Sequence, residues 1–124
     1  MTMTAYRQDR ERGVLDSWGT PEDIGAETLD GAIACAGGIT LGALDKPVFG
    51  GEYSATRGRY RVTYAFHEHA TLLEGEVALT DESTGNTVLY GPGDSWLIAK
   101  GTPVVWDIRS DIARKSFLAV TIEI

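Results

Sequence analysis

The sequence of 124 residues contains one cysteine, two histidines and four prolines. The single cysteine, Cys35, cannot form a disulfide within the chain, and its alanine-rich, apolar surroundings predict a buried thiol. No apolar run reaches the roughly 18 residues that a transmembrane helix requires. The first residues are polar and charged and lack the apolar segment of a secretory signal. These absences predict a cytoplasmic protein.

Positive charge is also scarce. Eleven Lys and Arg residues face 18 Asp and Glu residues, which gives a net charge of −7. This balance argues against a nucleic-acid-binding or membrane-binding surface. Arg57, Arg59 and Arg61 are spaced by two and would share one face of a strand. That face is either a solvated exterior or a stripe that binds anions.

The length fits one domain, preceded by an arm. We expect residues 1–28 to form the arm and residues 29–124 to form the domain. Within the arm, Thr20 and Pro21 have the pattern of a helix start, and Gly25 would end that helix after a short turn. Three apolar residues would fasten the arm to the domain: Val14, Leu15 and Trp18.

From residue 32 onward the pattern is typical of β-structure. The glycine pairs Gly37-Gly38 and Gly50-Gly51 predict breaks between short strands. Apolar and polar residues alternate from Arg59 to Phe66, which predicts a half-buried strand. Gly75 and the segment Gly91–Asp94 predict turns, with Asp94 capping the second turn. Further strands are expected at 76–80, 87–90, 96–99, 104–108 and 115–124, so the chain should be all-β.

Three phrases in this region resemble the cupin superfamily of small jelly-roll barrels. They are L-L-E-G-E-V-A-L-T-D-E, Y-G-P-G-D-S-W-L-I and W-D-I followed by R-K-S-F. The closer similarity is to single-domain cupins related to (S)-ureidoglycine aminohydrolase. The resemblance implies an RmlC-like cupin jelly-roll β-barrel, also called a double-stranded β-helix.

The cupin motif can be aligned in two ways. With Glu68 as the motif glutamate, Gly75 falls seven residues later, as the family pattern requires, and the histidine positions become Val62, Tyr64 and Val104. Three of four ligands are then missing, so we expect no tightly bound metal. In the alternative alignment, His67, His69 and Glu74 fit an H-x-H-x4-E pattern, but the residue seven positions after Glu74 is Asp81 instead of glycine. A divalent transition metal, if one is bound, would use Glu68, His67 and His69, provided that the strand bulges. The first alignment keeps the spacing and is preferred.

The first alignment makes Glu68 the best functional candidate. A carboxylate inside an apolar barrel must be hydrogen-bonded, paired or protonated, so Glu68 is either a structural group or an acid/base catalyst. Tyr64 either packs or donates to a ligand, and Lys115 is expected on the surface. Four further residues would line the ligand site: Val62, Trp96, Val104 and Trp106. The tryptophans are either core residues or a platform for a planar ligand.

Two functions fit these residues. The first is a hydrolase or isomerase that acts on a small polar molecule, with a carbonyl, ureido or sugar group, through Glu68. The alternative is a non-catalytic module that binds or senses such a molecule without metal. We also expect a homodimer, because a small jelly roll leaves sheet edges to cover. The segment from Leu29 to Ile39 and the C-terminal strand would supply that contact.

Overall fold

The structure is a computed structural model that describes residues 3–8 and 15–124, so Val14 lies outside the described residues. In these ranges the chain forms a nine-stranded sheet and one short 3-10 helix. The elements are β1 (Asp16–Gly19), η1 (Pro21–Ile24), β2 (Glu27–Asp30), β3 (Cys35–Gly42), β4 (Val48–Thr63), β5 (His67–Glu74), β6 (Val77–Asp81), β7 (Asn86–Tyr90), β8 (Ser95–Ile98) and β9 (Pro103–Val120). The all-β prediction is confirmed. No helix in the described ranges is long and apolar enough to cross a membrane.

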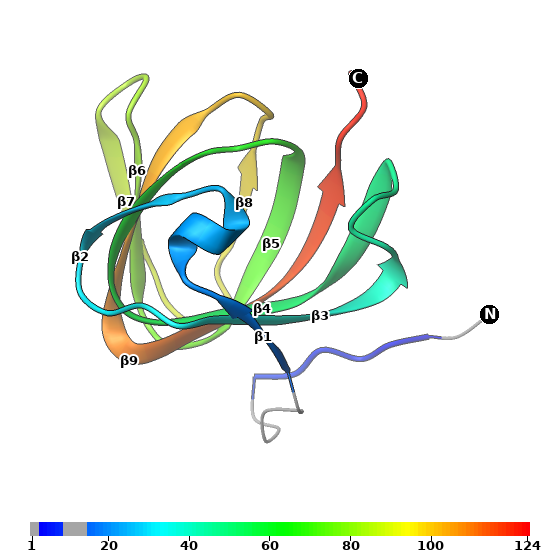
Figure 1. The fold of residues 1–124 in the computed structure, drawn as a ribbon, viewed down its shortest axis with the longest axis horizontal. Coiled ribbons are helices and arrows are strands. Elements are labelled where there is room, and N and C mark those ends of the chain that lie inside the picture. The colour runs from blue at the N-terminus through cyan, green and yellow to red at the C-terminus, as the bar shows by residue number, and fades with distance from the viewer. Residues whose placement is uncertain (1–2, 9–14) are drawn as a thin grey trace.

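Two long antiparallel strands, β4 and β9, join two groups of strands into a barrel (Figure 1). Residues 48–56 of β4 and 112–120 of β9 lie with β1, β3, β5 and β8. The other halves of the two strands, residues 58–63 and 103–108, lie with β2, β6 and β7. The pairing shifts between Thr56 and Gly58, where β4 passes from one group to the other. Side chains from both groups therefore meet in one interior.

The glycine pairs lie inside strands, so the expected breaks were wrong. Gly37 and Gly38 belong to β3, and Gly50 and Gly51 belong to β4. A Cβ on Gly51 would stand 1.9 Å from the carbonyl oxygen of Gly38. Glycine here allows β3 and β4 to approach closely. Because glycine is also typical of turns, the sequence pattern alone did not distinguish the two cases.

The turns and helix ends predicted from the sequence are confirmed. Gly75 follows β5 with a φ of 94°. The Asp94 carboxylate accepts the N–H of Gly91 at 2.8 Å and so caps its turn. Before η1, the Asp23 carboxylate accepts the N–H of Thr20 at 2.8 Å, and Gly25 ends the helix with a φ of 84°.

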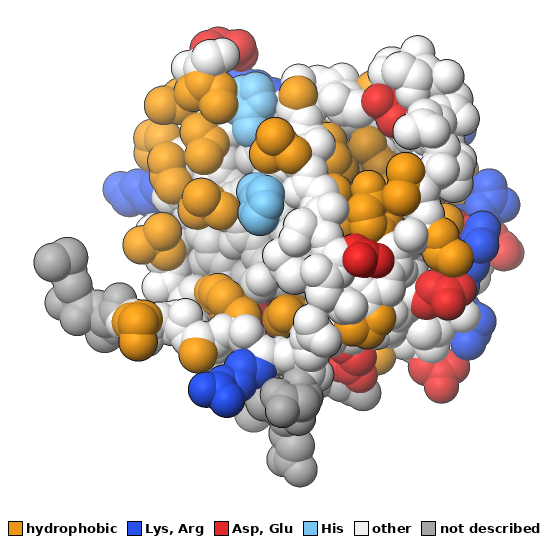
Figure 2. Space-filling model, turned by 180° about the vertical axis from the view of Figure 1, so that it is seen from behind, with side chains coloured by type: hydrophobic (Ala, Val, Ile, Leu, Met, Phe, Trp, Pro, Cys, Tyr) orange, Lys and Arg blue, Asp and Glu red, His pale blue; other side chains and the backbone are white. Residues whose placement is uncertain are grey.

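The C-terminal strand is not an exposed edge, so its backbone cannot supply the dimer contact that the sequence analysis expected there. β9 pairs with β4 on one side and with β5 and β6 on the other, and β3 pairs with β1 and β4. The outer face of β5, β8 and β9 instead carries hydrophobic side chains around the two histidines (Figure 2). Leu97 of β8 is 77% exposed and Leu118 of β9 is 43% exposed, and both lie opposite His69.

Trp18 and Arg114 connect the N-terminal residues to the barrel. The Trp18 ring occupies the space over Gly37, where a Cβ would stand 2.3 Å from the ring. On the outside of the barrel, Arg114 is 1% exposed and forms ion pairs with Glu52 at 3.1 Å and with Glu74 at 3.4 Å. It also donates to the Arg7 carbonyl at 3.4 Å. The expected fastening of the arm by Trp18 is therefore confirmed, and Arg114 adds a second attachment.

Candidate functional site

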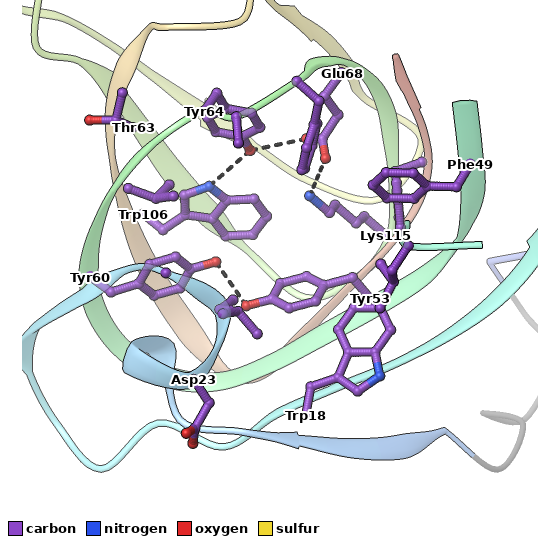
Figure 3. Close-up of a pocket in the computed structure, with 17 residues that line it drawn as sticks. Trp18, Asp23, Phe49, Tyr53, Tyr60, Thr63, Tyr64, Glu68, Trp106 and Lys115 are labelled. Carbon is purple, nitrogen blue, oxygen red and sulfur yellow. Dashed lines mark hydrogen bonds and ion pairs between the residues drawn. The ribbon is translucent and has the colours of Figure 1, made fainter. Parts of the chain in front are cut away.

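The interior of the barrel contains a cavity of about 490 Å³. Side chains from β4, β5 and β9 form its walls, and η1 with Trp18 borders it on one side (Figure 3). The lining is mainly aromatic: Trp18, Phe49, Tyr53, Tyr60, Tyr64, Phe66, Trp106 and Phe117. The lining has three charged residues: Asp23 of η1, which is exposed, and Glu68 and Lys115, which are buried. The cavity thus combines an apolar surface with one opposed pair of charges.

Glu68 points into the barrel, where its side chain is 1% exposed. Strand alternation places it on the same face of β5 as Ala70 and Leu72, which are also buried. Oε1 accepts the Tyr64 hydroxyl at 3.0 Å and the Trp96 indole N–H at 2.9 Å. Oε2 accepts the Lys115 ammonium at 2.7 Å. These three donors offset the desolvation of the carboxylate, which would otherwise make its burial costly.

Lys115 lies inside the barrel, which corrects the expectation of a surface charge. It is 6% exposed and shares the inner face of β9 with Ala113, Phe117 and Ala119. The alternation of small and apolar residues at 113, 117 and 119 was the sequence signal for this orientation. It was missed because a lysine in a strand is usually solvated.

Aromatic rings surround the Lys115 ammonium. Nζ lies 4.7 Å from the centre of the Trp106 ring, 5.0 Å from that of Tyr53 and 5.4 Å from that of Phe117. Ring faces attract a cation at such distances. Burial nevertheless lowers the pKa of Lys115, and the Glu68 carboxylate opposes this shift. The amine is therefore charged by its partner and easier to deprotonate than an exposed lysine.

Tyr64 links Glu68 to Trp106. Its hydroxyl accepts the Trp106 indole N–H at 3.2 Å and donates to Glu68. Burial, and then the charge of Glu68, raises the pKa of Tyr64 well above its usual value. Tyr64 therefore remains a neutral donor, and in this structure its hydroxyl donates to Glu68.

A second hydrogen-bonded group lies in the same cavity and was missed in the sequence. The Tyr53 and Tyr60 hydroxyls are 3.0 Å apart, and Tyr53 also donates to the Cys35 sulfur at 3.3 Å. Cys35 is buried as predicted, and burial raises the pKa of its thiol. Alternation in β4 marked Tyr60 as an inward residue, but nothing in the sequence paired it with Tyr53.

The remaining candidates fall on two sides of the barrel interior. Val62 lines the main cavity. Val104 pairs in register with Val62 but lines a second hollow, between β6, β7 and β8, together with Trp96. Trp106 lines the main cavity, where its ring stacks on Tyr60 with 5.6 Å between centres. Trp96 reaches the site only through its indole N–H, which holds Glu68.

The two histidines do not join Glu68. Alternation along β5 turns them to the outer face, where His69 is exposed. The Nδ1 atom of His67 accepts the Lys100 backbone N–H at 3.0 Å, while its buried Nε2 has no hydrogen-bond partner among the described residues. The strand does not bulge between His67 and His69, because their pairing with β9 is regular. The geometry thus follows the alignment that makes Glu68 the motif glutamate.

The residues around Glu68 do not fit a transition metal. In residues 3–8 and 15–124, no group of three His, Cys, Asp or Glu side chains lies close enough to share an ion. Both Glu68 oxygens are already bonded to donors, and one donor is an ammonium at 2.7 Å. A metal cation at this carboxylate would be repelled by Lys115 and would lack the further ligands that it requires.

The arginine stripe faces outward and is partly neutralised. Arg57 contacts Asp111 at 3.2 Å, and Arg61 contacts Glu82 at 2.7 Å. The Arg57 side chain is 60% exposed and the Arg61 side chain is 42% exposed. These carboxylates compete with any anion, so the geometry favours the solvated exterior over an anion-binding stripe.

Comparison with known proteins gives a family and a fold. A family model described as "EutQ-like cupin domain" matches residues 50–117. The EutQ protein of Clostridium difficile is 16% identical, with a TM-score of 0.61 over 72% of this chain and 69% of that chain. The polyketide cyclase RemF of Streptomyces resistomycificus is 17% identical, with a TM-score of 0.61 over 98% of this chain and 81% of that chain. Ectoine synthase of P. lautus is 16% identical, with a TM-score of 0.62 over 77% and 69% of the two chains. A search of curated proteins gives no match.

Proposed function

The chain belongs to the EutQ-like cupin domain family, whose model covers more than half of it, and we propose that it binds a small polar, carbonyl-bearing molecule in its barrel. The match confirms the jelly-roll cupin fold that the sequence phrases implied. In this proposal Glu68 is the acid/base group, and Tyr64, Lys115 and Trp106 position the ligand. The reaction would be a hydrolysis or an isomerisation.

One observation carries the proposal: a buried carboxylate and a buried ammonium stand 2.7 Å apart on the wall of an aromatic cavity. A proton can pass between these two groups without solvent, which is what acid/base chemistry at a carbonyl requires. The aromatic walls favour a ligand with a flat face. Burying an ion pair costs desolvation energy and often adds no net stability to the fold. Its presence on a cavity wall therefore favours a functional role over a stabilising one.

A second candidate is a binding or sensing module without chemistry. It is favoured by the saturation of the polar network, since Tyr64 and both Glu68 oxygens already have protein partners. A ligand would then bind mainly through the aromatic walls. The two candidates differ in whether Glu68 exchanges its partners when the ligand enters.

The sequence resemblance and the related folds bear on the identity of the ligand. The resemblance to ureidoglycine aminohydrolase-like cupins favours a ureide, and it rests on the phrases at 72–82, 90–98 and 106–117. The related folds named above include a cyclase and a synthase, so the scaffold is compatible with different chemistries. We therefore propose ureides first, and sugars and organic acids as the other classes.

We also propose that the site works without a metal, since its donors do not fit one. Protein purified without a histidine tag should contain far less than one equivalent of zinc, manganese or iron. Elemental analysis measures this content directly. A full equivalent of any of these metals would contradict the proposal.

A thermal-shift screen with ureides, sugars and organic acids tests the function. At least one class should raise the melting temperature of the wild type and not that of Glu68→Gln, once circular dichroism has shown that the variant is folded. Proton NMR of each binder, incubated with a much smaller amount of the protein, then separates the two candidates. An enzyme consumes its ligand, whereas a binding module does not. Equal binding by wild type and Glu68→Gln would contradict the role of Glu68. Lys46→Arg, which changes an exposed residue, is the matched control.

A further inference from the structure

The Lys115 amine lies where a covalent nucleophile would be needed. Lys115 lines the cavity and is 6% exposed, so a ligand in the cavity can meet its amine while little of the residue is open to solvent. The rings of Tyr53 and Trp106 fix the position of the ammonium. Figure 3 shows the side chain directed at Glu68 and not at the barrel exterior. A lysine in an apolar pocket is the usual source of a nucleophilic amine.

Glu68 supplies the second group that such chemistry requires. At 2.7 Å it can take the proton that makes the amine a nucleophile, and it can return that proton to a departing oxygen. Tyr64, which donates to the same carboxylate at 3.0 Å, holds Glu68 in place during both transfers. Nucleophile, proton carrier and positioning donor therefore converge from β9, β5 and the β4–β5 connection.

We propose that Lys115 forms an imine with an aldehyde or ketone bound in the barrel. This inference rests on the proposed function, which it deepens by naming a carbonyl compound as the ligand and Lys115 as the group that reacts with it. It gives the Glu68–Lys115 pair a covalent role that ligand binding alone does not require. No oxidant, reductant or metal is needed.

The step balances in protons and electrons. The Lys115 ammonium first transfers a proton to Glu68, and the amine lone pair attacks the carbonyl carbon. The carbonyl π pair moves to oxygen, which takes the proton from Glu68. The nitrogen then returns a proton to Glu68, which passes it to the hydroxyl, and water leaves as the nitrogen lone pair forms the C=N bond. An ammonium and a carbonyl become an iminium and one water, and Glu68 ends as the carboxylate.

Reductive trapping tests this inference, and the chain contains internal references. Its three lysines are Lys46, Lys100 and Lys115, and the first two are exposed. The full chain is incubated near neutral pH with glyoxylate or benzaldehyde and cyanoborohydride, and the modified lysine is identified by peptide mass mapping. We expect Lys115 to be modified first, to about one equivalent, and Lys100→Arg to leave that modification unchanged. In Glu68→Gln the rate at Lys115 should fall by about 100-fold, a contribution typical of a positioned acid/base group.

The outcomes separate this inference from the proposed function. Benzyl alcohol, which has no carbonyl, reports occupancy of the cavity through tryptophan fluorescence. If the probes change that fluorescence but only Lys46 and Lys100 are modified, the imine is excluded and the binding function remains. If neither fluorescence nor Lys115 responds to any probe, both proposals fail. Because the mapping is done on the wild type, the result does not depend on whether a Lys115 variant folds.

Discussion

At the scale of single residues, Glu68 and Lys115 explain each other. Each side chain is almost fully buried, and each would be an unpaired charge without the other. The carboxylate also has two neutral donors, Tyr64 and Trp96, whereas the ammonium has aromatic ring faces. The pair is therefore a single unit, because a change at either residue leaves the charge of the other buried without its partner.

A double-mutant cycle measures this dependence. Glu68→Gln leaves a buried ammonium without its counter-charge, and Lys115→Met leaves a buried carboxylate, so each should lower the free energy of unfolding by about 3–5 kcal/mol. The double variant is neutral at both positions and should cost at least about 1 kcal/mol less than the sum. Urea denaturation followed by circular dichroism gives all four values. Additive losses would show that the two charges do not act as a unit.

The three tyrosines of the cavity provide a test with alkaline pH. Burial raises the pKa of Tyr53, Tyr60 and Tyr64 well above their usual value of 10.0. Above pH 10 the unfolded chain therefore releases protons that the folded chain retains, so stability falls as pH rises further. We expect these three phenols to ionise only as the protein unfolds.

Absorbance at the phenolate band, recorded with circular dichroism during an alkaline titration, checks this expectation. The sequence has five tyrosines, and three of them line the cavity. Ionisation of all five phenols before any loss of structure would contradict the burial of the cavity tyrosines.

At the scale of elements, β4 and β9 position the site. β9 provides Lys115 and Trp106 from its two halves, and β4 provides Tyr53 and Tyr60. Because each strand passes through both groups of strands, residues far apart along one strand face the same interior. The close approach of β3 and β4 at Gly51 keeps this wall in place.

Gly51→Ala tests that close approach. The added Cβ would meet backbone atoms of Gly38 at 1.9 Å, and backbone yields less readily than a side chain. We expect a loss of about 1–3 kcal/mol or more in the free energy of unfolding. Gly91→Ala is the matched control, since its Cβ would have no atom nearer than 3.9 Å and its φ is not positive. Equal stability of the two variants in urea would show that β3 and β4 are not in tight contact.

Sequence patterns predicted where strands lie, but they did not predict that β4 and β9 are each one long strand. Alternation identified the inward face from Tyr60 to Phe66, and the spacing from Glu68 to Gly75 identified the motif carboxylate. The same patterns divided β4 and β9 into pieces, because Gly50-Gly51 has the composition of a turn. The partner of Glu68 could not be predicted, since Lys115 reaches it only through the pairing of β9 with β5.

At the scale of the whole molecule, the outer face of β5, β8 and β9 is the surface that we propose for a homodimer. Leu97 and Leu118 are exposed there around His69. Exposed apolar clusters of this kind mark association surfaces. It differs from the edge contact expected at the C-terminal strand, because both edges of β9 are already paired.

Light scattering tests the dimer. The wild type at micromolar concentration should have twice the chain mass of 13.4 kDa. Leu97→Glu should give the monomer mass with unchanged stability, because Leu97 is 77% exposed and a charge there would be desolvated only in the dimer. Val88→Glu, a change at an exposed residue of β7, is the control and should remain dimeric. A monomeric wild type would refute the proposal.

We propose that the Glu68–Lys115 pair in the aromatic cavity forms the ligand site, and the NMR signals of the lysine side chains test this most directly. Protein labelled with carbon-13 at the lysine ε position gives one signal for each of Lys46, Lys100 and Lys115. The signal of Lys115 should be shifted by the rings of Trp106 and Tyr53, and it alone should move when a binder from the screen is added. Three superimposed lysine signals, or a Lys115 signal that a bound ligand leaves in place, would contradict the claim.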